Sequence, residues 1–306
     1  MRNGTRRLVR ALMSASVLSF ATTATWSQSL TWLGTLPGGD ITYAHAVTDG
    51  AVVVGWAYNA SRQWRAFRWT ASEGMQNLGT LGGNESWAWG VSANGAVVVG
   101  VAANAAGQTR AFRWQNGVMQ DLGTLGGSSS DALGVSADGT VVVGGAVNAA
   151  GQRRAFRWEN GVMQDLGTLP GGYRSEAWGV SADGSVVVGY ASNAAGQRRA
   201  FRWTASGGMQ DLGTLGGDWS VASGVSADGS VVVGGASNAA GQRRAFRWTA
   251  SGGMEDLNRT YASLLTNGSE LVWARAISPD GRYIVGWGYN ATTRRYEAFL
   301  LDTGPR

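Results

Sequence analysis

Six short segments of the sequence share an alanine whose neighbours differ in chemical type. The alanines are Ala44, Ala88, Ala132, Ala177, Ala222 and Ala274. The preceding positions carry Tyr43, Trp87, Asp131, Glu176, Val221 and Trp273, and the following ones His45, Trp89, Leu133, Trp178, Ser223 and Arg275. Aromatic rings beside carboxylates and arginine suit a polar ligand with flat apolar faces, such as a sugar, or a protein loop with an anchor residue. The candidate ligand-binding residues are therefore Tyr43, His45, Trp87, Trp89, Asp131, Glu176, Trp178, Trp273 and Arg275.

The residue types present in the sequence give little support to a catalytic function. His45 is the only histidine, so a histidine metal cluster cannot form and a Ser-His-Asp triad would depend on that one residue. Glycoside hydrolysis needs only two carboxylates, and Asp131 and Glu176 lie in neighbouring segments. We assign no catalytic residue, metal or cofactor, and we keep a glycan-active hydrolase that uses these carboxylates as an alternative to a binding module.

The segments belong to a unit of about 45 residues that occurs six times. One marker, Leu-Gly-Thr-Leu, begins at Leu33, Leu78, Leu122, Leu166 and Leu212, with a degenerate copy at Leu257. A second marker, Ala-Phe-Arg-Trp, ends at Trp69, Trp114, Trp158, Trp203 and Trp248, and its last copy ends at Leu301. Each unit contains short apolar runs separated by Asp-Gly, Asn-Ala-Ala-Gly and Asn-Gly turns, which predict four antiparallel strands.

Four antiparallel strands per unit predict an all-β fold, a six-bladed β-propeller in which the candidate residues surround one mouth of the central channel. The alternative is that these side chains only pack the channel rim. The last unit lacks a fourth strand and residues 29–36 have the sequence of one, so we expect the N-terminal strand to close the last blade. The predicted propeller spans 28–306, with blades at about 43–82, 87–126, 131–170, 175–216, 220–258 and 272–302, the last closed by 29–36.

The recurrent arginine and aspartate are both replaced in the last unit, by Glu297 and Trp32, and the first unit has Arg65 with Asn77, which favours a structural ion pair within each blade. The predicted structural pairs are Arg110 with Asp121, Arg154 with Asp165, Arg199 with Asp211, and Arg244 with Asp256. A recurrent asparagine opens the turn between the second and third strands, where we expect local backbone hydrogen bonds rather than ligand binding. These asparagines are Asn59, Asn104, Asn148, Asn193, Asn238 and Asn290.

The charge balance and a predicted export signal limit the kinds of partner that the protein can have. All 25 basic residues are arginine, and four of them lie within the first 27 residues, which leaves 21 against 20 acids. That balance removes the electrostatic case for nucleic acid. Residues 1–27 combine a basic start, an apolar run at 11–21 and small residues near Ala24, which predicts a cleaved signal peptide. No other segment is long enough to span a membrane. We expect an exported protein, periplasmic or extracellular, that binds protein or carbohydrate at the cell surface or serves as a purely structural or adhesive component.

The motifs Gly-Thr-Leu-Gly-Gly, Gly-Val-Ser-Ala-Asp-Gly and Ala-Phe-Arg-Trp resemble those of the HAF-repeat family of extracellular bacterial proteins. The resemblance covers nearly everything after the predicted signal peptide. It implies a propeller-like repeat fold and an extracellular location, and it brings no catalytic residues with it. The His of the family's His-Ala-Phe tripeptide is replaced by arginine at Arg65, Arg110, Arg154, Arg199 and Arg244.

Overall fold

The computed structural model describes residues 30–265 and 267–304. In this part of the chain the strands form six antiparallel sheets in chain order, of which five have four strands and the last has three. The prediction of an all-β fold built from four-stranded antiparallel units is therefore confirmed. Of the described residues, those from Leu33 onward belong to one compact unit. The predicted signal peptide, residues 1–27, lies outside the described residues.

We number the sheets 1 to 6 along the chain. Sheet 1 contains β1 (Thr42–Val47), β2 (Val53–Tyr58), β3 (Trp64–Thr70) and β4 (Gly74–Asn77). Sheet 2 contains β5 (Gly82–Val91), β6 (Val97–Asn104), β7 (Thr109–Gln115) and β8 (Val118–Asp121). Sheet 3 contains β9 (Gly126–Val135), β10 (Val141–Asn148), β11 (Arg153–Glu159) and β12 (Val162–Asp165).

Sheets 4 to 6 repeat this arrangement, with a short insertion before the last. Sheet 4 contains β13 (Ser175–Val180), β14 (Val186–Ser192), β15 (Arg198–Thr204) and β16 (Gly208–Asp211). Sheet 5 contains β17 (Gly216–Val225), β18 (Val231–Asn238), β19 (Arg243–Thr249) and β20 (Gly253–Asp256). The insertion forms α1 (Leu257–Thr260) and a 3-10 turn at Ala262–Leu264, and sheet 6 contains β21 (Glu270–Ile277), β22 (Tyr283–Asn290) and β23 (Arg295–Asp302). No helix within the described ranges has the length and apolar character needed to cross a bilayer.

The turns between the strands use the expected local chemistry. Asn148 Oδ1, between β10 and β11, accepts hydrogen bonds from the backbone nitrogens of Ala150 at 3.0 Å and Gln152 at 2.9 Å. Asp138 Oδ1, between β9 and β10, accepts from Ser136 Oγ at 2.6 Å and from the backbone nitrogen of Thr140 at 3.0 Å. The equivalent asparagines also accept bonds from the backbone of their own turns, which confirms their predicted turn role: Asn59, Asn104, Asn193, Asn238 and Asn290.

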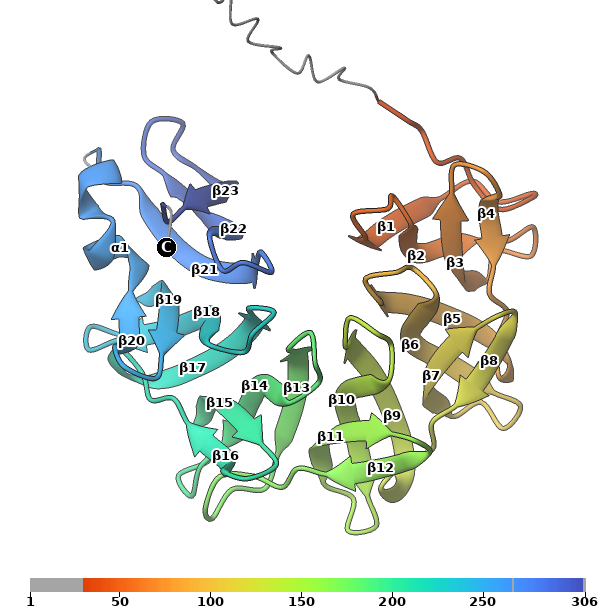
Figure 1. The fold of residues 1–306 in the computed structure, drawn as a ribbon, viewed down its shortest axis with the longest axis horizontal. Coiled ribbons are helices and arrows are strands. Elements are labelled where there is room, and N and C mark those ends of the chain that lie inside the picture. Colours follow the sequence, from red (N-terminus) through yellow and green to blue (C-terminus); the bar gives the residue numbers. More distant parts are fainter. Residues whose placement is uncertain (1–29, 266, 305–306) are drawn as a thin grey trace, which may run out of the picture. The chain divides into compact units, whose positions relative to one another are not determined.

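The core lies between neighbouring sheets. The sheets follow one another around an arc, with the first strand of each on the inner side and the fourth on the outer side (Figure 1). Between sheets 2 and 3, Val97 and Val99 of β6 pack against Val142, Phe156 and other apolar residues of sheet 3, and all four are fully buried. The Val triplets have both faces covered, which explains why they lack the alternation of a half-exposed strand.

A glycine after each Val triplet, or after the equivalent run, lets the first two strands of a sheet come close. A Cβ on Gly144 of β10 would lie 1.9 Å from the carbonyl oxygen of Asp131 on β9. The equivalent glycines meet the same obstacle: Gly55, Gly100, Gly189, Gly234 and Gly286. No side chain fits at these positions without moving the innermost strand.

Buried polar bridges tie each of sheets 1 to 4 to the sheet that follows it. Ser130 Oγ of β9 accepts from the backbone nitrogen of Ala111 at 2.9 Å and donates to the carbonyl of Gly123 at 2.5 Å. On β7, Arg113 Nε donates to the carbonyl of Gly139 in sheet 3 at 3.0 Å. The serine bridge recurs at Ser86, Ser175 and Ser220, and the arginine bridge at Arg68, Arg157 and Arg202.

The predicted closure of the last blade by residues 29–36 is not present in the described structure. Sheet 6 has only its three strands, and residues 30–36 form no strand. Leu30 and Trp32 are 79% and 86% exposed, whereas Leu36 is buried against Ala57 and Phe67 of sheet 1. A physical reason lies in sheet 6, which lacks the polar groups that join the other sheets. Leu300 and Glu297 stand where β7 has Arg113 and Arg110. Pro279 stands at the position of Ala137, whose backbone nitrogen donates to the next sheet, and proline has no N–H.

The close approach at Gly144 makes a direct stability prediction. Gly144→Ala should lower the free energy of unfolding by about 3 kcal/mol or more, because the added methyl overlaps a backbone oxygen that cannot rotate away. Gly50→Ala is the matched control, since its Cβ would meet only Thr48 Oγ1 at 3.7 Å. Its effect should stay within about 0.5 kcal/mol. Urea unfolding measures both, and equal effects of the two changes would contradict the packing argument.

Candidate functional site

The structure explains why the residues after the constant alanines vary. In sheet 1, Ala44 pairs with Gly55 and Ala46 pairs with Val54, so His45 is the extra residue of a β-bulge. The pairing also shifts at this point in the other sheets, and the residues at the shift are Trp89, Leu133, Trp178, Ser223 and Arg275. A bulge residue is left out of the strand ladder and its side chain is re-aimed, so its type is free to change.

The residues before the alanines face the second strand of their own sheet. Asp131 pairs with Gly145 and Glu176 with Tyr190, while Val221 pairs with Gly235 and Tyr43 with Trp56. Where the second strand carries glycine, a large side chain fills the space. A Cβ on Gly145 would lie 2.7 Å from the Arg153 guanidinium. We call the two variable positions of all six sheets the rim.

Arg153 brings together two rim carboxylates from different sheets. Its guanidinium lies 2.5 Å from Asp131 Oδ2 in sheet 3 and 2.9 Å from Glu176 Oε1 in sheet 4. Tyr190 donates its hydroxyl to Glu176 Oε2 at 2.7 Å, and Arg174 lies 3.5 Å from the same oxygen. Both oxygens of Glu176 are therefore engaged, and its side chain is only 13% exposed.

The electrostatics of this network keep Glu176 ionised. Burial by itself would raise the pKa of Glu176, but the charge and hydrogen bond of Arg153, together with the Tyr190 hydroxyl, outweigh burial and hold it below its ordinary value. Burial and the neighbouring carboxylate raise the pKa of Tyr190 to about 12, so Tyr190 stays a neutral donor. A general acid in glycoside hydrolysis needs a raised carboxyl pKa, which is the opposite direction.

An aromatic cluster extends from this network across sheets 4 to 6. Its members are Trp178, Tyr190, Trp219, Trp273 and Trp287. Trp178 and Trp273 lie 6.5 Å apart with planes at 19°, although they come from different sheets. Trp273 is buried, packs over Gly235 and donates its indole N–H to Ser223 Oγ at 2.8 Å. We call this set the sheet 4–6 aromatic cluster.

A second aromatic group lies on sheets 1 and 2. The His45 ring is 4.9 Å from the Trp89 ring, and Trp56 is 4.8 Å from Trp89. Tyr43 is 6.0 Å from Trp56 and 5.9 Å from Trp64, and it is exposed. Trp87 pairs with Val101 and is half-buried. Among the rim residues, Tyr43, His45 and Trp89 therefore meet in one group, and Asp131, Glu176, Trp178 and Trp273 meet in the other.

Several residues of these groups were not among the sequence candidates. Arg153, Tyr190 and Trp219 each contact a predicted rim residue, and so does Trp56. A sequence signal was available for all four, because the positions of Arg153, Tyr190, Trp219 and Trp56 also vary between otherwise similar units. Placing these residues beside the rim required knowledge of the strand register.

The predicted structural arginines have a different main role. Arg110 approaches Asp121 at 3.8 Å and Arg154 approaches Asp165 at 3.9 Å, both long for an ion pair. Their stronger bonds cross to the next sheet, as in the 2.5 Å bond from Arg110 to the carbonyl of Ser128, and Arg154 donates likewise to Tyr173.

The other two arginines do not form the predicted pairs in the described structure. Arg244 binds Glu270 of sheet 6 at 3.0 and 3.1 Å instead of Asp256. Asp256 instead accepts the backbone N–H of Asn258 and caps α1. Arg199 donates to Gln197 at 3.1 Å, and Asp211 accepts the backbone N–H of Gly213. For Arg244, a link between sheets replaces the predicted pair because the long side chain reaches across the junction, whereas Arg199 bonds within its own repeat.

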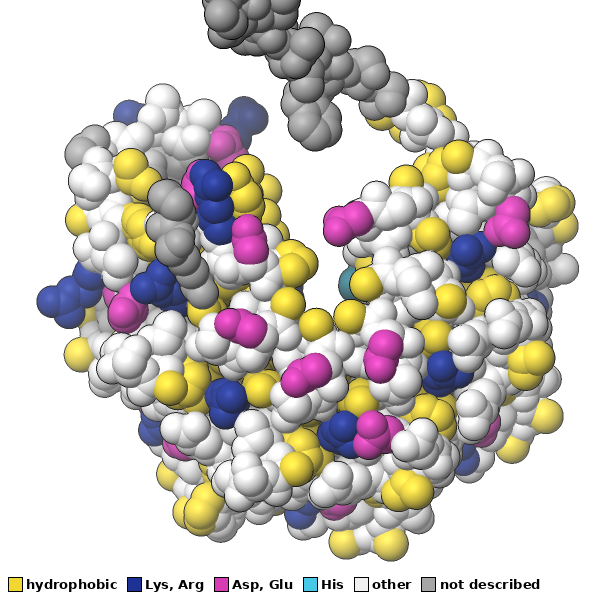
Figure 2. Space-filling view, viewed as in Figure 1, with side chains coloured by type: hydrophobic (Ala, Val, Ile, Leu, Met, Phe, Trp, Pro, Cys, Tyr) yellow, Lys and Arg dark blue, Asp and Glu magenta, His cyan; other side chains and the backbone are white. Residues whose placement is uncertain are grey.

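Two other surfaces are formed mainly by residues outside the two aromatic groups. On the face shown in Figure 2, acidic side chains gather along the inner side of the arc. The aspartates in the turns after the innermost strands accept hydrogen bonds from residues of the same turn. Such bonds from Ser181 and Ser185 lower the pKa of Asp183 to about 2.

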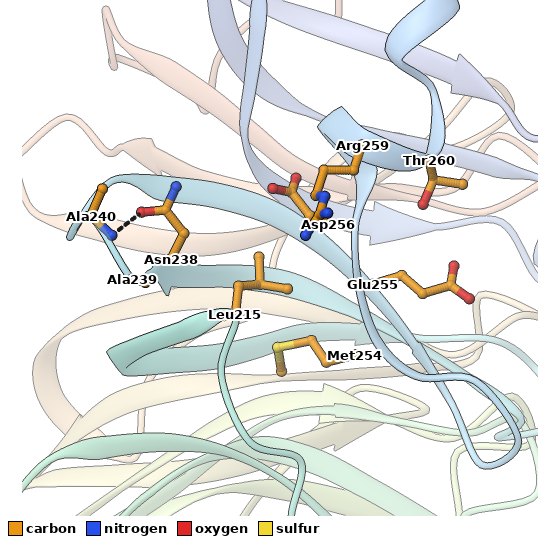
Figure 3. Close-up of a pocket in the computed structure, with 9 residues that line it drawn as sticks. All are labelled: Leu215, Asn238, Ala239, Ala240, Met254, Glu255, Asp256, Arg259 and Thr260. Atoms are coloured by element: carbon orange, nitrogen blue, oxygen red, sulfur yellow. Dashed lines mark hydrogen bonds between the residues drawn. The ribbon is translucent and has the colours of Figure 1, made fainter.

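A pocket of about 550 Å³ at the outer edge of sheet 5 is lined by Met254, Glu255, Arg259 and neighbouring residues (Figure 3). In the described ranges, no three His, Asp or Glu side chains group in a way that could hold a metal ion.

Comparison with known proteins identifies the fold. No family model and no curated protein sequence matches the chain. It is similar in structure to TolB from Acinetobacter baumannii, with a TM-score of 0.54 and 12% identity over 82% of this chain and 60% of that protein. The TolB-type protein of Agrobacterium tumefaciens gives 0.53 and 16%, over 85% and 88%. A prolyl endopeptidase gives 0.55 and 11%, over 86% of this chain and 41% of the enzyme. These likenesses show the fold alone, that of a β-propeller.

The Glu176 network should make stability depend on pH. A carboxyl whose pKa is lowered on folding adds stability above its ordinary value of 4.5, and this contribution disappears as the pH falls through the lowered pKa. Glu176→Gln should therefore destabilise the protein at neutral pH, and the difference from the native protein should shrink as the pH falls below 4.5. Unfolding midpoints in urea across this range measure the effect.

Glu73→Gln provides the control for that measurement. The Glu73 side chain is 61% exposed and pairs with Arg68 at 2.7 Å, so its loss should change stability by about 1 kcal/mol or less at any pH. A Glu176→Gln difference that stays constant down to acidic pH would contradict the assigned network.

Proposed function

We propose that this protein is an exported binding scaffold whose ligand contacts the rim at one mouth of the propeller channel. The observation that carries the proposal is the placement of variable residues on β-bulges, where a side chain can change without disturbing the strand ladder. The Asp-Gly turns of the same repeats keep their sequence. Sequence variation between repeats is therefore concentrated at positions where a ligand could be contacted.

The chemistry of the rim supports a ligand that is polar and has flat apolar faces. Exposed Tyr43 and half-buried Trp178 offer ring surface, and exposed Arg275 offers five donors. Aromatic and arginine side chains are the types that dominate binding energy at interfaces. Protein or carbohydrate at the cell surface fits this description. The leader-like sequence of residues 1–27 supports export to the periplasm or beyond, in keeping with the HAF-repeat resemblance.

Hydrolysis of a glycan has less support than binding. Its two carboxylates would be Asp131 and Glu176, and both accept bonds from Arg153. Glu176 is not poised as a proton donor, because Arg153 and the Tyr190 hydroxyl hold the pKa of this buried carboxyl below its ordinary value.

The same proposal includes a closed ring of six blades in which residues 30–36 complete sheet 6. Leu33-Gly34-Thr35-Leu36 copies the tetrapeptide that follows the fourth strand of sheet 2, where the Leu122 nitrogen donates to the Ala111 carbonyl at 3.0 Å. Thr42 Oγ1 donates to the Gly34 carbonyl at 3.0 Å, which is the bond that Ser130 Oγ makes to Gly123. Half of the serine bridge is thus in place, and its missing partner would be the Ala298 nitrogen.

Exposed apolar residues at the end of the arc also support closure. Val285 and Leu300 of sheet 6 are 41% and 67% exposed. Val285 is equivalent to Val99, which the following sheet buries completely. Sheet 1 in contact with sheet 6 would cover this surface and leave no open sheet edge.

Closure can be tested with a disulfide, because the chain has no cysteine. The register of sheet 2, in which Arg113 pairs with Gln120, predicts that Thr31 lies opposite Leu300. Thr31→Cys combined with Leu300→Cys should form a disulfide within one chain, detected by non-reducing electrophoresis and peptide mass spectrometry. Thr31→Cys with Val118→Cys is the control pair. A bond only between two chains, or no more bond than in the control, would contradict closure.

Ligand binding by the rim can be tested with the mature chain on glycan arrays and on cell surfaces. Changing Trp178 and Arg275 together to Ala should weaken the strongest interaction by about tenfold or more, because aromatic and arginine anchors dominate binding. Val162→Ala, at an exposed apolar residue on β12, is the control and should bind as the native protein does. Equal binding by the native protein and the rim variant to every partner would refute the proposed site.

A further inference from the structure

Three arginines on or beside the rim, in sheets 4 to 6, lie over aromatic rings and have no acidic partner among the described residues. The guanidinium carbon of Arg198 is 4.9 Å from the centre of the Tyr190 ring, and that of Arg243 is 5.1 Å from Trp219. Arg275 lies 5.2 Å from Trp273 in the same way. All three are exposed, and none forms an ion pair with the described residues. Stacking holds each guanidinium in place while leaving its N–H groups free.

The three rings belong to the sheet 4–6 aromatic cluster, so the arginines form one surface. Trp219 and Trp273 are 5.1 Å apart, and Trp178 lies 5.8 Å from Tyr190. Nearby acids are largely neutralised. Arg153 and Arg174 pair with Asp131 and Glu176, and Arg244 pairs with Glu270. Exposed Asp218 is the remaining carboxylate beside Trp219, and it accepts a bond from Ser237 at 3.4 Å. The surface over sheets 4 to 6 therefore carries an excess of positive charge.

A groove of about 520 Å³ between sheets 5 and 6 adjoins this surface. Arg243 and Arg244 lie on one side of it, and Trp287 and Tyr296 lie on the other. Tyr296 is 70% exposed, and its ring is 5.7 Å from that of Trp287. The groove thus places the guanidinium of Arg243, which is held by stacking on Trp219, across from the exposed ring of Tyr296.

We propose that the surface of Arg198, Arg243 and Arg275, with the Trp287–Tyr296 groove, binds an acidic polysaccharide built from uronate units. This inference rests on the proposed binding function and names its ligand class. A uronate has a carboxylate that matches the arginine fork and a ring whose C–H face fits an aromatic side chain. Arg198 and Arg243 occupy the same position in consecutive repeats, so they present charge at a regular interval, as a polymer of charged sugars does.

Other polyanions match this arrangement less well. Single-stranded nucleic acid needs open ring faces on which its bases stack, and arginines already cover Tyr190, Trp219 and Trp273. An acidic peptide would satisfy the arginines, but the carboxylates of Asp and Glu are not attached to a ring that could lie on the Trp287–Tyr296 surface, as the carboxylate of a uronate is.

The test uses the mature protein with oligogalacturonate as the probe and the methyl-esterified oligomer as the matched control ligand. The ester keeps the sugar rings and removes the charges. Calorimetry should show that the native protein binds oligogalacturonate at least about tenfold more tightly than the ester, and more weakly as salt is added. Arg243→Gln should weaken binding about tenfold, equivalent to about 1.4 kcal/mol. Arg259→Gln, at the outer edge of sheet 5, should leave binding unchanged.

Three results would overturn the inference. The first is equal binding of the charged and esterified oligomers, or no binding of either. The second is an equal effect of Arg243→Gln and Arg259→Gln. The third is competition by polyaspartate or a single-stranded oligonucleotide at the same concentration as oligogalacturonate, which would indicate a protein or nucleic-acid ligand. The binding function itself would survive these results if the Trp178 and Arg275 double variant still lost a partner that the Val162→Ala protein retained.

Discussion

The structure depends on the contact between neighbouring sheets. Each four-stranded sheet has two apolar faces and no core of its own, so it is stable only when another sheet covers it. The Val triplets and the Phe of the third strand supply most of this contact, and burial of each such side chain contributes about 1.5 to 3 kcal/mol. Buried serines such as Ser130 set the spacing, because they bond to two backbone groups of the preceding repeat.

This constraint separates conserved from variable positions within the repeats. Side chains between sheets must keep their size, and the glycine after the Val triplet must have no side chain. Bulge positions such as Trp178 and Arg275 lie outside the strand ladder, so they can differ without disturbing the repeat. The same contact accounts for the end of the arc at sheet 6, where Val285 remains exposed although its equivalent Val99 is covered.

The charge beside the rim depends on which arginines form ion pairs with carboxylates. The QRRAF segments of sheets 3, 4 and 5 provide equivalent arginines at Arg153, Arg198 and Arg243, but the neighbouring residues differ. Arg153 reaches two carboxylates because Gly145 leaves room for it. Arg198 and Arg243 meet aromatic rings and keep their hydrogen-bonding groups free. One repeated residue thus has a structural role in one sheet and is available to a ligand in the next two.

The sequence alone determined the strands, their antiparallel order, the turn roles of Asn148 and Asp138 and the strand on which the variable residues lie, because these follow from local periodicity and turn chemistry. It could not determine which variable residues meet. Arg153 joins Asp131 to Glu176, and Trp178 faces Trp273, only because sheets 3 to 6 stack with a particular spacing. Arg244 binds Glu270 instead of Asp256 for the same reason. Contacts between sheets depend on the relative placement of whole repeats, and residue spacing within a repeat carries no record of that placement.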